Sequence, residues 1–95
     1  MKIRWTKRAL NTIEQVLEYL ELDWGTVTSE KFVRSFQRNL KTLSQTPRIG
    51  KTYDKKRGVR AFVISKHITI YYRIKNEVII ILQVFVNKQN PSKRV

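Results

Sequence analysis

Most side chains in this sequence that are capable of chemistry are cationic. The chain has 20 Lys and Arg residues against 7 Asp and Glu, and its formal net charge is +13. The cations are unevenly distributed, because residues 1–30 have a net charge of −1 whereas residues 31–95 have a net charge of +14. A positive field of this size attracts phosphate groups or an acidic protein. We therefore expect an acidic macromolecule to bind the part of the chain after residue 30.

The other reactive residue types exclude the common hydrolytic and metal-dependent sites. The sequence has no cysteine and therefore no disulfide or thiolate metal site. His67 is the only histidine, and its sequence neighbours supply no partners for a metal ion. The seven acids are scattered, with no Ser/His/Asp order and no glycine-rich phosphate loop. We expect no metal and no cofactor. Any catalysis would depend on Arg and Lys stabilising a charged transition state, and on Tyr or a perturbed Lys moving protons.

The N-terminal part of the chain is predicted to form a strand and a helix. Residues 2–5 alternate between polar and apolar, as in a short strand. Thr6 stands at an N-cap position, and Gly25 stands where a helix commonly ends. Between them, one apolar stripe recurs at steps of three and four residues: Leu10, Ile13, Leu17, Leu20 and Trp24.

A second helix is predicted from Thr28 or Ser29 to about Ser44. Its apolar face consists of Phe32, Phe36, Leu40 and Leu43. Its cations lie roughly half a turn away, at about 100° per residue: Lys31, Arg34, Arg38 and Lys41. The short connection between the helices predicts an antiparallel helical hairpin.

The rest of the chain is predicted to be a loop followed by three strands. Residues 44–58 contain Pro47, Gly50 and Gly58 without clear periodicity, which is typical of a loop. Strands are predicted over residues 59–64, 67–74 and 77–86, with turns at Ser65-Lys66 and Lys75-Asn76. The last of these strands is apolar on both faces, which favours a central position in a sheet. The polar residues 87–95 are expected to leave the sheet.

These elements predict one α+β domain over residues 1–95, in the order β-α-α-β-β-β. The last three strands form an antiparallel meander. The first strand pairs antiparallel with the free edge of the last, which completes a four-stranded antiparallel sheet with the helical hairpin on one face. The sequence contains no signal peptide, and its longest apolar run, Val78 to Leu82, is too short to cross a membrane. We expect a cytoplasmic protein.

These elements contain a series of residues in a defined order: Trp5-Thr6, Ala9, Ile13, Leu40, Leu43, Pro47, Gly50, Lys51, Gly58-Val59-Arg60, Ile70-Tyr71-Tyr72-Arg73 and the apolar last strand. In this series, the sequence resembles the RelE/ParE toxins of bacterial type II toxin–antitoxin modules along nearly its whole length. The Gly-Val-Arg element before a strand and the Ile-x-Tyr-Arg element are closer to the ParE branch than to the RelE branch.

The resemblance implies a toxin that a co-expressed antitoxin neutralises, and two classes of target. ParE-like members inhibit DNA gyrase, and RelE-like members cut messenger RNA on the ribosome with Arg, Lys and Tyr side chains. The ending Phe85-Val86-Asn87-Lys88-Gln89-Asn90-Pro91 lacks the His-x-x-Arg-type ending of ParE. Lys88 stands near the position of a catalytic Arg in RelE-like toxins, but no terminal Tyr follows it.

Three functions therefore stay open. The leading one is a ParE-like toxin that binds a target such as gyrase. The second is a ribosome-dependent endoribonuclease, with Arg60, Lys51, Lys88 and Tyr53 as catalytic residues. The third is a degenerate, basic nucleic-acid-binding module. We expect the antitoxin to be acidic or amphipathic. The candidate residues for binding the antitoxin or the target are Arg34, Arg38, Lys55, Lys56, Arg57, Arg60 and Arg73.

Overall fold

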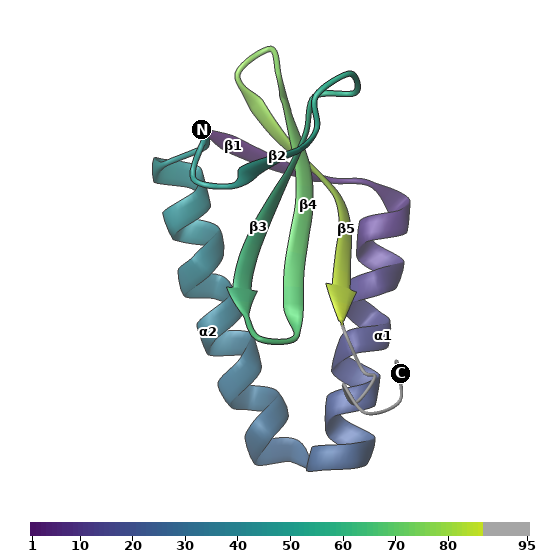
Figure 1. The fold of residues 1–95 in the computed structure, drawn as a ribbon. Coiled ribbons are helices and arrows are strands. Elements are labelled where there is room, and N and C mark those ends of the chain that lie inside the picture. The colour runs from purple at the N-terminus through teal and green to yellow at the C-terminus, as the bar shows by residue number, and fades with distance from the viewer. Residues whose placement is uncertain (87–95) are drawn as a thin grey trace.

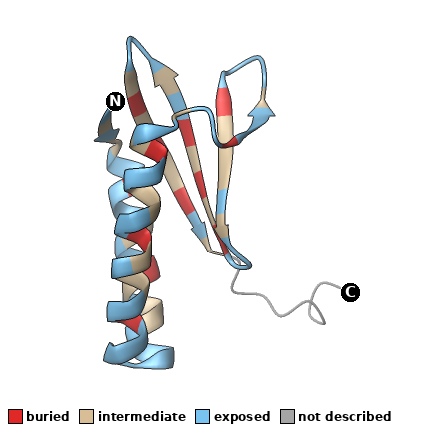
Figure 2. Cartoon of the chain, turned by 90° about the vertical axis from the view of Figure 1, so that its left-hand side faces the viewer, coloured by how far each residue is buried: buried red, intermediate tan, exposed pale blue. Residues whose placement is uncertain are grey.

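Two helices cover one face of a five-stranded sheet in the computed structural model, which describes residues 1–86 (Figure 1). Viewed from the side, the helices and the sheet form two layers, and no helix of residues 1–86 lies over the second face of the sheet (Figure 2). The elements are β1 (Lys2–Trp5), α1 (Lys7–Trp24), α2 (Thr26–Gln45), β2 (Lys51–Asp54), β3 (Val59–Ser65), β4 (Ile68–Lys75) and β5 (Val78–Val86).

The α+β class and the helical hairpin are confirmed, but the sheet differs from the predicted one in two ways. Its strand order is β1-β5-β4-β3-β2, so β5 lies inside the sheet as predicted. The predicted loop contains an additional strand, β2, which pairs antiparallel with β3. The pairing of β1 with β5 is parallel, not antiparallel. The second difference follows from the first, because the β2–β3 hairpin reverses the chain once more before β5.

Thr6 determines where α1 begins and how it is attached to the sheet. Its hydroxyl oxygen accepts a hydrogen bond from the Ala9 amide at 3.0 Å, as an N-cap does. The same hydroxyl donates to the carbonyl oxygens of Ile81 and Leu82, at 3.0 Å and 3.3 Å respectively. The predicted N-cap therefore also joins the start of α1 to β5.

The apolar stripe predicted on α1 is wrong by about one residue. Ala9 and Val16 are the buried residues of this helix, whereas Leu10 is 48% exposed and Trp24 is 64% exposed. Ile13 and Leu20 pack against the core as predicted. The small Ala9 is fully buried in the core cluster. On α2 the predicted face is confirmed, with Phe36 and Leu43 buried.

The core lies between the helices and the covered face of the sheet. Its largest fully buried side chains are Tyr72, Leu43, Ile70, Ile79 and Ile81. The two predicted turns in the meander each lie one residue later. Asn76 and Glu77 form the β4–β5 turn, with φ angles of 51° and 60°. This backbone suits the twist of a two-residue hairpin.

Candidate binding site on the open sheet face

A buried tyrosine fixes the loop that leads into β2. The Tyr72 hydroxyl donates to the Pro47 carbonyl oxygen at 2.6 Å and accepts from the Gly50 amide at 2.9 Å. A Cβ at Gly50 would lie 2.7 Å from that hydroxyl, so this close approach requires glycine. Burial raises the pKa of Tyr72 above its usual value, although the Gly50 hydrogen bond and the charges of Arg60 and Arg48 oppose the shift.

Arg60 stabilises the same loop from the next strand. Its guanidinium donates to the Gly50 carbonyl oxygen at 2.7 Å and to the Arg48 carbonyl oxygen at 3.4 Å. Because Arg60 pairs with Tyr72 across β3 and β4, both side chains lie on the face that the helices cover. Several residues that carry the family resemblance are thus joined in one structural cluster.

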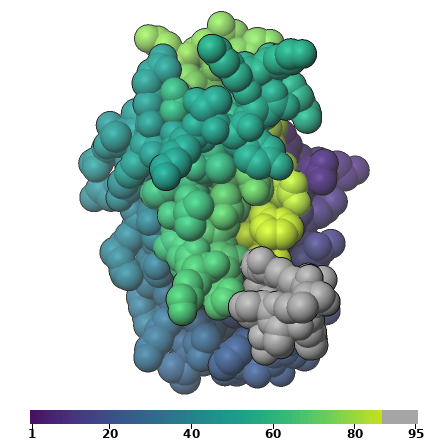
Figure 3. Space-filling model, in the orientation of Figure 1, coloured from purple at the N-terminus to yellow at the C-terminus, as the bar shows by residue number. Residues whose placement is uncertain are grey.

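The register places other candidate residues on the opposite, open face of the sheet. Lys51 pairs with Ala61, and Ala61 pairs with Tyr71, so these three side chains project to one side. Tyr53 belongs to the same side, because its ring meets the Tyr71 ring edge-on with the ring centroids 4.8 Å apart. This face of the sheet is the one seen in the space-filling view (Figure 3).

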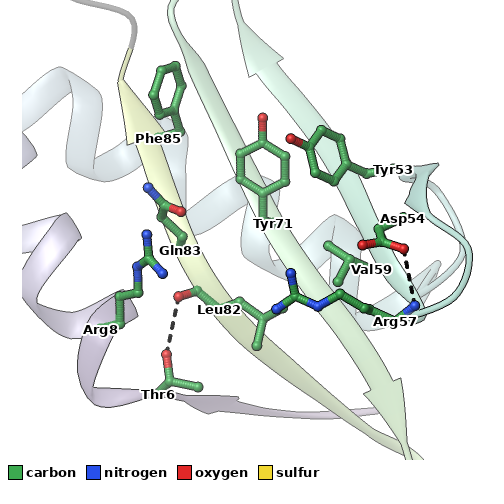
Figure 4. Close-up of a pocket in the computed structure, with 10 residues that line it drawn as sticks. All are labelled: Thr6, Arg8, Tyr53, Asp54, Arg57, Val59, Tyr71, Leu82, Gln83 and Phe85. Carbon is green, nitrogen blue, oxygen red and sulfur yellow. Dashed lines mark hydrogen bonds between the residues drawn. The ribbon is translucent and has the colours of Figure 1, made fainter.

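A pocket of about 630 Å³ opens on this face (Figure 4). It combines aromatic rings with two arginines, one from the start of α1 and one from the β2–β3 turn. The Arg57 backbone amide donates to the Asp54 carboxylate at 3.2 Å, which holds that turn closed. The lining residues are Thr6, Arg8, Tyr53, Asp54, Arg57, Val59, Tyr71, Leu82, Gln83 and Phe85.

Tyr71 in the pocket is suited to binding and not to accepting protons. Burial, and then the neighbouring Tyr53, raise the pKa of Tyr71 above its usual value of 10.0. Tyr71 is therefore neutral near pH 7 and presents a ring face and a hydroxyl donor. Aromatic rings beside guanidinium groups can stack on nucleobases or hold an extended segment that carries carboxylates.

The structure divides the predicted site residues among three places. Tyr53 and Arg57 line the pocket, and Lys51 shares its face of the sheet. Lys55 and Lys56 are exposed on the neighbouring turn, and Arg73 is exposed beside the pocket, opposite Val59 on β3. Arg34 and Arg38 are exposed on α2, half a turn from the buried Phe36. Arg60 lies on the covered face, and Lys88 lies outside the described residues.

Sequence reasoning missed Arg8, Gln83 and Phe85 as pocket residues. Phe85 is 45% exposed although it lies in a strand that reads as apolar on both faces. Arg8 reaches the pocket because the start of α1 lies beside β5, a contact between residues far apart in the chain. Of these three residues, only Phe85 could have been found from the sequence. The last strand was predicted to be apolar on both faces, but the predicted helices covered only one of them.

Residues 1–86 contain neither a metal-binding cluster nor a membrane-spanning helix. No group of three or more His, Asp or Glu side chains in this part of the chain is arranged to hold a metal ion. Within the same range, neither helix is long and apolar enough to cross a membrane.

A helical hairpin on one face of a sheet, with a pocket of aromatic and arginine side chains on the other face, defines a small two-layer α+β domain. The family model of the ParE toxin of the type II toxin–antitoxin system, parDE, matches residues 3–91. This chain therefore belongs to the ParE toxin family of type II toxin–antitoxin systems. A comparison with curated proteins gave no match.

Solved structures share the fold at low sequence identity. The chromosomal ParDE toxin–antitoxin system from P. aeruginosa matches with a TM-score of 0.76 and 21% identity, over 93% of this chain and 97% of that one. The YoeB/ParE toxin from Agrobacterium tumefaciens gives a TM-score of 0.62 and 14% identity, over 92% and 99%. The YoeB–YefM complex from Staphylococcus aureus gives 0.60 and 14%, over 92% and 97%.

Proposed function

We propose that this ParE-family toxin arrests growth by binding a macromolecular target such as DNA gyrase, without cutting RNA. The observation that carries this proposal is the separation of the residues that a ribonuclease would have to bring together. Arg60 lies on the covered face and its guanidinium is bonded to backbone carbonyls, whereas Lys51 and Tyr53 lie on the open face. Arg60 thus projects from the side of the sheet opposite to that of Lys51 and Tyr53, which disfavours their meeting at one phosphate.

The neutral phenol of Tyr71 suits the pocket to binding. Proton transfer near pH 7 is most efficient when the pKa of the catalytic group lies near the working pH. Burial moves the pKa of this phenol away from neutrality. The pocket thus offers hydrogen-bond donors, ring faces and positive charge, which are the components of a binding site.

The partner that fits the open face is an acidic or amphipathic antitoxin. The solved relatives include a ParDE system and a YoeB–YefM complex, both of which pair a toxin with an antitoxin. A segment that carries carboxylates would place them beside Arg8 and Arg57 and its apolar groups against Tyr53, Tyr71 and Phe85. Complex formation would slow as salt rises, because exposed charges are screened beyond about 8 Å at physiological ionic strength. Such a complex would form in the cytoplasm.

The test of the target measures two activities after the toxin is induced without its antitoxin. We expect growth arrest, inhibition of supercoiling by purified gyrase, and intact cellular mRNAs in a primer-extension map. New mRNA ends at ribosome-protected positions, with gyrase unaffected, would replace this proposal by the ribonuclease function. Robust growth with folded protein at a high level would leave only the degenerate binding module.

The test of the open face compares two double variants that lose the same charge. Arg8→Ala with Arg57→Ala removes the pocket arginines, and Arg34→Ala with Arg38→Ala removes two exposed arginines of α2. If the antitoxin encoded beside the gene binds the pocket, the first variant binds it more weakly than the second. Equal losses of affinity would show that antitoxin binding depends on the net positive charge of the protein and not on the pocket.

A further inference from the structure

One end of the molecule has the opposite charge to the rest. Residues 9–30 contain five acids and no Lys or Arg, whereas all 20 cations and the other two acids lie elsewhere in the sequence. All five acids are exposed: Glu14, Glu18, Glu21, Asp23 and Glu30. Both ribbon views show the helical hairpin running past the end of the sheet (Figure 1; Figure 2). We call residues 18–30, which include the turn between the two helices, the hairpin tip.

The hairpin tip also exposes large apolar side chains. Leu22 is 77% exposed, Trp24 is 64% exposed and Val27 is 67% exposed, and all three lie within six residues around the turn. Single exposed apolar residues are ordinary, but a group of them on a projecting element is typical of an interaction surface. Tryptophan in particular is enriched among the residues that dominate protein interfaces.

The backbone of the tip is held in a defined shape. Gly25 adopts a φ of 89°, which favours glycine, and separates α1 from α2. Its amide donates to the Glu21 carbonyl oxygen at 3.1 Å, and its own carbonyl oxygen accepts from the Ser29 amide at 3.1 Å. The three apolar side chains are therefore presented on an ordered turn, which lowers the entropy cost of docking.

We propose that the hairpin tip is the anchor by which the toxin holds a protein target, and that the target surface is basic with an apolar socket. The charge of the tip excludes two occupants, because nucleic acid and an acidic antitoxin would both be repelled by it. A basic protein surface complements the acids, and its socket takes Trp24, Leu22 and Val27. This inference rests on the proposed function in one respect, namely that the toxin acts on a target by binding it.

The tip and the open sheet face are separate surfaces with opposite charge. The molecule is only 38 Å along its longest axis. An antitoxin seated on the sheet face would therefore obstruct a large target that approaches the tip. This arrangement lets the antitoxin neutralise the toxin without binding the tip itself.

The first experiment removes the apolar anchor and leaves the charge unchanged. The variant Leu22→Ser with Trp24→Ser is compared with wild type and with Leu10→Ser, which removes an exposed apolar side chain elsewhere on α1. The readouts are growth arrest, inhibition of purified gyrase, melting temperature and retention on a heparin column. We expect the tip variant to melt and elute like wild type but to bind gyrase about 30-fold more weakly or worse. The Leu10→Ser control should keep its affinity.

The second experiment changes charge at the tip and at a matched position. Glu21→Lys is compared with Glu77→Lys, an equal change of charge in the β4–β5 turn. A basic partner surface predicts that Glu21→Lys weakens binding to gyrase by about twofold to fivefold at low ionic strength, and that Glu77→Lys does not. Tighter binding after Glu21→Lys would indicate an acidic partner and overturn the inference.

The outcomes separate this inference from the proposed function. If the wild type inhibits gyrase and the Leu22→Ser, Trp24→Ser variant does so equally well, the tip is not the anchor, although the target stands. If the wild type arrests growth without affecting gyrase, gyrase is not the target. In that case, growth arrest by the Leu22→Ser, Trp24→Ser variant tests whether the tip is the anchor. Arrest that persists in that variant overturns the anchor, and loss of arrest supports it. A wild type that does not arrest growth refutes both.

Discussion

Replacing Arg60 by alanine is expected to destabilise the fold instead of removing a catalytic group. The Arg60 guanidinium donates to the Gly50 carbonyl oxygen at 2.7 Å and to the Arg48 carbonyl oxygen at 3.4 Å, and alanine loses both hydrogen bonds. The loop that they hold leads directly into β2, the strand that completes the pocket. The loss of these hydrogen bonds should therefore lower the stability of the fold directly. It should weaken binding only indirectly, by changing the position of β2.

The size of the effect follows from the geometry. A hydrogen bond to a charged group contributes about 1.5–3 kcal/mol to stability. The 2.7 Å bond accounts for most of this, because the 3.4 Å bond is long. We expect a loss of about 2 kcal/mol. For a domain of this size, 1 kcal/mol lowers the melting temperature by about 4–8 °C, so the expected shift is roughly 10 °C.

The assay is thermal unfolding followed by circular dichroism, with growth arrest scored on the same variant. Arg73→Ala is the matched control, because Arg73 is an exposed arginine on the neighbouring strand. It should melt within about 4 °C of wild type, since surface changes usually cost less than 0.5 kcal/mol. If Arg60→Ala melted like wild type and yet lost its toxicity, the structural role would be refuted and a direct role at the target established.

Other perturbations test the same cluster and the surface of α2. Tyr72→Phe should cost about 2–3 kcal/mol in a urea titration, because it leaves the buried Gly50 amide without its acceptor; Tyr71→Phe is the control, and equal costs would contradict the assignment. Because burial raises the pKa of Tyr72, the contribution of this side chain to the free energy of unfolding should persist below pH 10 and decrease as pH rises through the folded-state pKa. The Tyr72→Phe variant should not show this decrease. Gly50→Ala should cost about 1–3 kcal/mol through the 2.7 Å clash, and an unchanged midpoint would disprove the close approach. Arg34→Gln with Arg38→Gln should shift stability by less than about 0.5 kcal/mol per site, whereas a collapse of folding would place these cations in the interior.

The sequence by itself determined the features that depend on local signals. Thr6 and Gly25 mark the ends of α1 because an N-cap hydroxyl and a left-handed glycine act within one helical turn. The apolar face of α2 was predictable because Phe32, Phe36, Leu40 and Leu43 repeat at helical spacing. The family resemblance added the toxin class, which the charge alone would not have supplied.

Only the tertiary structure decided what depends on strand pairing. Lys51, Thr52 and Tyr53 read as a loop, and they form a strand because β3 offers them an edge to pair with. That added strand reverses the chain and makes the β1–β5 pairing parallel.

The same pairing separates residues that are close in the sequence. Arg60 faces the helices with Tyr72, while its neighbour Ala61 lies on the open face of the sheet with Tyr71. Alternation along a strand tells which residues of that strand share a face, but not which residues of the neighbouring strands lie opposite them. The pairing of the strands makes that choice, and for this reason Arg60 became a support of the loop while Arg8, Tyr53 and Phe85 came together around the pocket.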